Sequence, residues 1–268
     1  MAGGADDSVL GAGLLAGAAN VIMQLSRPGV GHGVVESRVD SGNLFKRPVK
    51  RTRTTITYLA VALLGSDEER AAFRRAVNRQ HAQVRSTERS PVSYNAFDPE
   101  LQLWVAACLY KGVEDLHRLI GDVTDPEVLE ELYRDSAALG TTLQVREDMW
   151  PADRAEFERY WNEQLDHVHI DDTVRDFLHD VAALKFLPAP LSTAFGGFNL
   201  FMTTGFLPPR FREEMRLPWT DRDQARFDRI IAALATAQKL TPKPLRRFPF
   251  NVALWDLRIR MRRGMPLA

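Results

Sequence analysis

The stretch DPELQLWVAACLYKGVEDLHRL, residues 98–119, decides the fold class. Its apolar residues recur at steps of three and four, which is the period of a helix and not the alternation of a strand. The apolar face is so wide that we expect this helix to be buried on most sides. The positions on that face are Leu101, Trp104, Val105, Cys108, Leu109, Gly112, Leu116 and Leu119.

Capping residues mark helix starts on both sides of this stretch. Ser66 and Glu69 form a capping box, in which each side chain bonds the other residue's free backbone N–H. Other starts are expected at residues 98–100, 124–127, 171–173 and 220–221, and loops at 88–93 and 207–219. Helical periodicity follows each start. We therefore predict an all-α protein, residues 1–268 forming a single domain of about eight to ten helices.

Composition excludes several classes of protein. The 35 basic and 35 acidic residues leave no net charge to attract a nucleic acid, so we expect no nucleic-acid partner. The 45% of hydrophobic residues is too high for a disordered chain. A single cysteine, Cys108, excludes a disulfide framework and a metal site built from cysteines alone.

Two apolar runs, residues 8–25 and 192–207, have nearly the length of a short membrane span. Asp6 and Asp7 precede the first run where a signal peptide has basic residues, and Asn20 and Gln24 interrupt it. We interpret both runs as buried segments without a transmembrane span. The alternative is contact with a membrane surface or an apolar ligand. No targeting signal is visible, so we expect a cytoplasmic protein, with membrane association as the alternative.

The usual catalytic motifs are absent from the chain. It has no HExxH zinc motif, no GxSxG elbow and no phosphate-binding P-loop. His167 and His169 alternate with Asp171, but they follow a helix end, and a metal site of this pattern needs a strand to bring both rings to one face. Cys108 lies within an apolar stripe, which favours an inert buried thiol.

His81 differs from the other histidines because Phe73 and Val77 precede it on one helical stripe. A buried imidazole needs a hydrogen-bond partner or a metal, since an unpaired polar group costs a few kcal/mol. Arginines surround this stripe, among them Arg51 before it and Arg85 after it. A neutral imidazole in an apolar pocket rimmed by cations suits a haem iron and its propionates. The alternative is a packed histidine beside a solvated basic face.

Taken together, several stretches resemble the family of the mpaB oxygenases and the rubber oxygenases, which include the latex-clearing proteins. Their order and spacing carry the resemblance more than any single one does. They are VIMQLSRPGVGHGVVE (21–36), KRTRTTITYL (50–59), GSDEERAAFRRAVNRQHAQVRS (65–86), SYNAFDPELQLWVAACL (93–109), MWPADRAEFERYW (149–161) and TTGFLPPRFREEM (203–215).

The resemblance implies an all-α fold with a globin-like core and one haem b. It implies that His81 is the proximal iron ligand, and that Arg51 and Thr55 lie near the distal side as catalytic residues. We expect His81, Arg51 and Arg85 to bind the cofactor. Glu36 lies roughly where rubber oxygenases have an acidic residue proposed as a base.

Two departures from the family pattern concern the haem pocket. Rubber oxygenases have a lysine just before the distal threonine, and here that residue is Thr54, so the distal face is expected to be open or capped by water. Many bacterial relatives have a histidine where this chain has Ala106. No second histidine is therefore expected in the pocket.

The expected function is that of a haem-dependent oxygenase, with O₂ opposite the histidine ligand and an apolar substrate, for which an isoprenoid is the candidate. The run 192–207 is a candidate wall of the substrate channel, with a plain core helix as the alternative. Two other functions stay open. One is a haem binder or sensor without turnover. The other is a cofactor-free helical protein that binds an apolar ligand or a partner.

Overall fold

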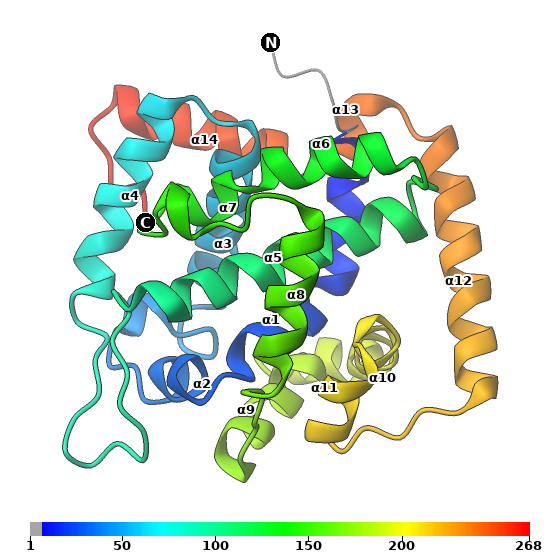
Figure 1. Cartoon of the computed structure of the whole chain (residues 1–268), viewed down its shortest axis with the longest axis horizontal. Helices are drawn as coiled ribbons and strands as arrows, with labels where there is room; N and C mark the ends of the chain where they lie inside the picture. Colours follow the sequence, from blue (N-terminus) through cyan, green and yellow to red (C-terminus); the bar gives the residue numbers. More distant parts are fainter. Residues whose placement is uncertain (1–6) are drawn as a thin grey trace.

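The computed structural model describes residues 7–268, and every regular element in that range is a helix (Figure 1). The one β-type contact there is an isolated antiparallel bridge between Arg85 and Asn95. The predicted all-α class is confirmed, whereas the globin-like arrangement of the core stays a prediction. The elements are η1 (Asp7–Ala16), α1 (Gly17–Leu25), α2 (Pro28–Val35), η2 (Asp40–Gly42), α3 (Pro48–Leu64), α4 (Asp67–His81), α5 (Pro99–Leu119), α6 (Pro126–Ser136), α7 (Ala138–Thr141), η3 (Glu147–Met149), α8 (Arg154–Leu165), α9 (Asp172–Ala182), α10 (Ala189–Phe206), α11 (Pro209–Glu214), α12 (Asp221–Leu240), α13 (Lys243–Arg246) and α14 (Phe250–Arg262).

Most of the predicted helix starts are confirmed. The capping box at Ser66 is formed, and Asp98, Asp171 and Thr220 each accept a backbone N–H of the first turn. The start expected at 124–127 lies one residue later than Thr124, because the side chain that caps α6 is that of Asp125. The helices outnumber the prediction because short pieces such as α7, α11 and α13 separate the long ones. Of these, α11 lies inside the predicted loop 207–219.

The main core surrounds α5, which crosses the middle of the molecule (Figure 1). Trp104 of α5 is fully buried and stacks on Trp161 of α8, with ring centroids 5.2 Å apart. Its indole N–H donates to the backbone oxygens of Met23 and Gln24 in α1. Cys108 is also fully buried, and burial raises the pKa of its thiol well above the usual value. The prediction that Cys108 is buried within an apolar helix is therefore confirmed, and the raised pKa agrees with an inert thiol.

The two apolar runs are packed differently. In α1, the residues Ala19, Ile22, Met23 and Leu25 are buried in the main core, as predicted. In α10, only the C-terminal half is buried, while residues of its N-terminal half such as Phe195 are exposed. The prediction that the second run is buried is therefore confirmed for its C-terminal half and wrong for its N-terminal half. Among the described residues, no helix combines the length and the hydropathy that crossing a bilayer requires.

A second, smaller core joins α3, α4 and α14, and it sets the position of the candidate site. Phe73 of α4 and Val61 of α3 are fully buried there, together with Leu257 of α14. The helices α3 and α4 form an antiparallel hairpin, because only Gly65 and Ser66 separate them. This hairpin brings the first turn of α3 beside the last turn of α4.

Candidate functional site

The hairpin of α3 and α4 brings two predicted site residues together. Arg51 lies in the first turn of α3, and His81 is the last residue of α4. Each residue lies thirteen or fourteen positions from the turn between the helices, so the two face each other across the hairpin. The two side chains are close enough to interact electrostatically, because the positive charge of Arg51 contributes to lowering the pKa of His81.

The imidazole of His81 is held in its neutral form. Burial, and after it the charge of Arg51, lowers the pKa of this side chain to about 4. Its Nδ1 atom is buried without a hydrogen-bond partner, and within residues 7–268 neither ring nitrogen makes a hydrogen bond. The ring has an edge contact with Phe97, with centroids 6.3 Å apart. Buried polar groups are nearly always paired. A neutral imidazole without a hydrogen-bond partner therefore has a ring nitrogen that is available to bind a ligand.

Arg51 lacks the partners that a shielded guanidinium normally has. The residue is half-buried, and burial lowers the pKa of its guanidinium. Over the described part of the chain, no carboxylate forms an ion pair with it. A cation withdrawn from water without a counter-ion is costly, so this position favours a site that receives an anionic or electron-rich group.

The threonines beside Arg51 are tied to the backbone of α3. The hydroxyl of Thr55 donates to the carbonyl oxygen of Arg51 at 3.1 Å, and Thr55 is exposed. The hydroxyl of Thr54 donates to the oxygen of Lys50 at 2.9 Å, and Thr54 is half-buried. Each hydroxyl keeps its two lone pairs available after donating, so either can accept one hydrogen bond from a ligand.

Arg85 belongs to the hairpin after α4 and not to α4 itself. It follows the end of α4, is exposed, and pairs with Asn95 in the antiparallel bridge. That bridge belongs to a hairpin, residues 84–96, in which Ser86 N–H donates to Tyr94 O at 2.8 Å and Ala96 N–H to Val84 O at 3.0 Å. The expectation that Arg85 binds the cofactor beside His81 gains no support, because the chain turns away from α4 before residue 85.

Two hollows of about 420 Å³ each are lined by residues other than His81. The first is at the start of α3, and the second is between η3 and α8. Neither is lined by His81, Arg51 or Thr55. The first is lined by Lys46, Arg47, Pro48, Val49, Lys50 and Arg53, and the second by Asp148, Met149, Trp150, Pro151, Ala152, Glu156, Arg159, Tyr160 and Glu163.

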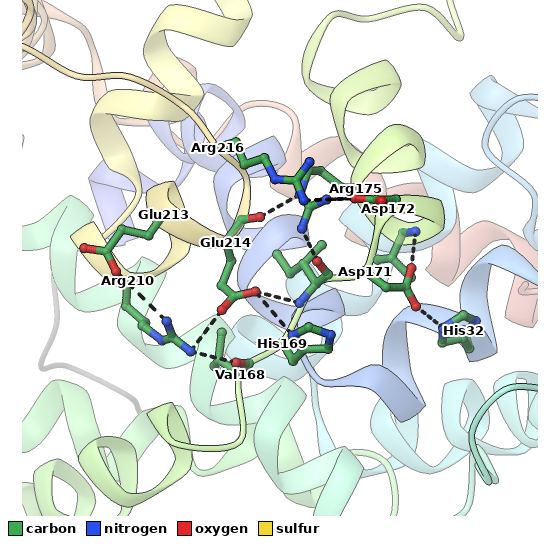
Figure 2. A network of polar contacts seen from close by, with 12 residues as sticks. His32, Val168, His169, Asp171, Asp172, Arg175, Arg210, Glu213, Glu214 and Arg216 are labelled. Atoms are coloured by element: carbon green, nitrogen blue, oxygen red, sulfur yellow. Dashed lines mark hydrogen bonds and ion pairs between the residues drawn. The ribbon is translucent and has the colours of Figure 1, made fainter.

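A second polar centre is built around His32 of α2, which is buried (Figure 2). Its Nε2 lies 2.6 Å from Asp171 Oδ2, and its Nδ1 lies 3.1 Å from Glu36 Oε1. A neutral imidazole has only one N–H, so donation to both carboxylates requires the imidazolium. This cation between two anions joins α2 to the N-cap of α9.

Glu36 carries the same network to the hairpin 84–96. Its Oε2 accepts from the Ser90 hydroxyl at 2.6 Å and from the Tyr94 hydroxyl at 2.9 Å. Burial alone would raise the pKa of Glu36, but the hydrogen bonds from Ser90, Tyr94 and His32 outweigh it and lower the pKa. Glu36 is therefore an ionised anchor for the hairpin that starts three residues after His81.

Further ion pairs extend the network from α9 to α11 (Figure 2). The guanidinium of Arg175 is mostly buried and donates to the backbone oxygen of Glu214 at 2.7 Å. The Glu214 carboxylate accepts the N–H of Ile170 at 2.9 Å and pairs with Arg210 at 2.9 Å. These contacts fix the segment between α8 and α9, so its polar residues serve the fold.

The alternating pair His167 and His169 lies in that segment. Both residues are exposed, and His169 Nδ1 is 3.7 Å from a carboxylate oxygen of Glu214. In the described part of the chain, no three side chains of His, Cys, Asp or Glu gather closely enough to hold a metal ion. A site with one protein ligand, such as His81, does not require such a cluster.

The network around His32 was not found from the sequence. The sequence indicates Asp171 as a helix cap and as a member of the alternating pattern with His167 and His169, but not as a partner of His32, which stands in a glycine-rich stretch. The partner Asp171 lies 139 positions from His32, so no local spacing could have joined them. The single available signal was a histidine four residues before an acidic residue, which is the spacing of one helical turn.

Comparison with known proteins gives one family and two curated relatives. The family model described as "ER-bound oxygenase mpaB/B'/Rubber oxygenase, catalytic domain" matches residues 8–236. Uncharacterised proteins of Mycobacterium bovis and of Mycobacterium tuberculosis are each 53% identical over 251 residues, which is 94% of this chain and 98% of the relative. No solved structure matches significantly.

Proposed function

This chain belongs to the family of the mpaB and rubber oxygenase catalytic domains, and from that membership we propose that it is a haem b-dependent oxygenase with His81 as the iron ligand. Family membership supports an oxygenase at the level of the reaction class. The cofactor and the substrate are the parts that we add. The proposed substrate is apolar, with an isoprenoid as the first compound to test.

One observation carries the proposal, namely the unpaired imidazole of His81. Iron is ligated by neutral imidazole, and a pKa of about 4 keeps His81 neutral at physiological pH. Its buried Nδ1 has no partner. A histidine with only a packing role would leave this cost uncompensated, whereas ligation gives the ring a function. The donor set therefore fits a haem iron.

The chain's own residues have separate tasks in this proposal. His81 would hold the iron through one ring nitrogen. Haem, when bound, would supply the activation of O₂, because the redox chemistry belongs to the cofactor. Arg51 would stabilise negative charge that develops nearby, since its guanidinium has no competing carboxylate. The hydroxyls of Thr54 and Thr55 would accept a hydrogen bond from a polar group, because both already donate to the helix backbone.

The first experiment is an absorption spectrum of protein purified with haem supplied. We expect a Soret band for the wild type and its loss in His81→Ala. His167→Ala is the matched control, because His167 is exposed in the segment between α8 and α9 and should leave the band unchanged. A wild type without a Soret band, or a His81→Ala variant that keeps it unaltered, contradicts the assignment of His81.

A second experiment separates an oxygenase from a haem binder without turnover. The second candidate is favoured by Thr54, which stands where rubber oxygenases have lysine, and by the exposed position of Thr55. Oxygen uptake is measured with short isoprenoids and with saturated alkanes of equal length. Steady uptake with a cleaved or oxygenated isoprenoid product supports the oxygenase. A Soret band without oxygen uptake in the presence of any of these compounds supports a haem-binding protein without turnover.

A further inference from the structure

The last 32 residues of the chain differ from the rest in charge. Residues 237–268 lie beyond the family match and carry eight Lys and Arg residues against one acidic residue, Asp256. Their net charge is therefore +7, and because the whole chain is neutral, the 236 residues before them carry −7. A neutral total thus conceals a strong separation of charge along the chain.

The same segment exposes large apolar side chains. In α13 and just after it, Leu245 is 64% exposed and Phe248 is 56% exposed. In α14, Trp255 is 63% exposed and Val252 is 47% exposed. Four such side chains thus lie within eleven consecutive residues, and several exposed large apolar side chains in one segment indicate an interaction surface more strongly than a single one does.

The helix α14 has two apolar faces, and only one of them is covered. Phe250, Leu254 and Leu257 are buried against α3 and α4 in the second core. Val252 and Trp255 point to the opposite side, because each residue turns the helix by about 100°. A helix that needed only to close the second core would have polar residues on its outer face.

Basic side chains border the uncovered face. Arg262 and Arg263 at the end of α14 are exposed, and within residues 7–268 neither of them has an acidic partner. Some other cations of the segment are paired, such as Arg258 with Glu69 and Arg260 with Asp256, both at 2.6 Å. Arg262 and Arg263, at the end of the helix that carries Val252 and Trp255, are therefore the cations on which the positive charge of this face rests.

We propose that this face, Leu245, Phe248, Val252 and Trp255 with Arg262 and Arg263, docks on the surface of an anionic lipid bilayer. A helix with Trp, Phe and Leu on one face and Lys or Arg beside it lies in the membrane interface, where the apolar side chains are buried among the acyl chains and the cations meet lipid phosphate. The −7 charge of the remaining chain is repelled from such a surface. The docked molecule is therefore oriented with α14 toward the lipid.

Charge decides between this occupant and the alternatives. In a symmetric dimer the same face meets itself, so two segments of charge +7 would be brought together, which opposes association. A nucleic acid would neutralise the charge and stack on Trp255, but it would leave the aliphatic Leu245 and Val252 in water. An anionic lipid surface satisfies both the apolar and the basic residues.

The test is co-flotation of the full-length protein with vesicles. One set contains phosphatidylcholine alone, and in the other part of the lipid is replaced by phosphatidylglycerol. We expect binding to the anionic vesicles only, and loss of that binding as sodium chloride is raised to about 0.5 M. Equal binding to both vesicle types, or binding to neither, overturns the proposal.

Two variants and one control locate the surface. Trp255→Gln should weaken binding about tenfold or more, since it removes the largest side chain that enters the lipid. Arg262→Gln with Arg263→Gln should weaken it about fivefold for each charge. Phe195→Gln is the control, because Phe195 is equally apolar and is 56% exposed on α10, outside the basic segment. It should bind like the wild type.

The melting temperature of each variant is also measured. Because the substituted residues are exposed, we expect values within about 2 °C of the wild type, which would exclude unfolding as the cause of weaker vesicle binding. Two further measurements detect the other occupants. If light scattering shows a dimer that Trp255→Gln dissociates, or if a fluorescent oligonucleotide binds where vesicles do not, the lipid proposal is wrong. The outcome is independent of the proposed haem site, because no readout uses haem or turnover.

Discussion

His32 and His81 are both shielded from water, yet their surroundings are opposite. The ring of His32 has a carboxylate on each nitrogen, whereas the ring of His81 has no hydrogen bond and a nearby arginine. The first arrangement satisfies every polar atom and joins two helices. The second leaves a polar ring unsatisfied, which is typical of residues kept for a ligand. The comparison therefore distinguishes a histidine whose contacts join two helices from one that we propose as a ligand-binding residue.

The largest difference is expected in stability. His32→Ala removes the cation between Glu36 and Asp171 and leaves two partly exposed carboxylates close together, so the free energy of unfolding should fall by about 2–4 kcal/mol. His81→Ala removes an unpaired ring from the cofactor-free protein and should change it by less than about 1 kcal/mol. Urea unfolding of both variants at pH 7.5 measures the two effects. Equal losses would contradict the distinction between the rings.

The next effect concerns pH. The folded-state pKa of His81 is about 4, below its usual 6.5, so between these values the unfolded chain binds a proton that the folded chain excludes. Stability should therefore be complete above pH 6.5 and fall as the pH drops toward 4, by about 2 kcal/mol after allowance for partial exposure. Urea unfolding at several pH values follows this loss.

In the His81→Ala variant, the fall in the free energy of unfolding between pH 6.5 and pH 4 should disappear. The carboxylates of Glu36 and Asp171 have lowered pKa values, so their contribution is lost only at lower pH, as the pH falls through those values. A wild type whose stability is constant from pH 6.5 to 4.5 would show that His81 is not held neutral by its surroundings.

The smallest effect is expected at Arg51. Arg51→Met keeps the length of the side chain and removes a shielded cation, so the pKa of His81 should rise by less than about one unit, because burial remains the larger cause. NMR titration of the His81 ring measures this shift. Arg85→Gln is the control, since Arg85 is exposed in the hairpin 84–96 and should leave the titration unchanged. An equal shift in both variants would mean that Arg51 has no special proximity to His81.

Most of the fold was predictable because its signals are local. Capping side chains act within three residues, and helical stripes act within two turns, so Ser66, Asp98 and the apolar face around Trp104 could be recognised in the sequence. The exposed half of α10 could not, because whether Phe195 is covered depends on helices that are distant in the sequence. Tertiary packing, and not periodicity, decides that question.

The proximity of His81 and Arg51 was also predictable, whereas their role as a site stays a prediction. His81 and Arg51 come together because a short turn joins α3 and α4, which is a nearly local effect. The role of Arg85 stays a prediction, and the sequence did not show that α4 ends at His81 and that Arg85 belongs to the following hairpin. The partnership of His32 with Asp171 depends on the packing of α2 against α9, and no sequence pattern records it.

The contact between α14 and α3 has a consequence for where the protein can be shortened. A fragment that ended with the family match at residue 236 would lack α14, and Val61 and Phe73 would lose the cover that Phe250, Leu254 and Leu257 provide. Because α3 also carries Arg51, the shared domain of this chain depends on a tail that lies outside it. Trimming the gene to the conserved-domain boundary would therefore yield an incomplete protein.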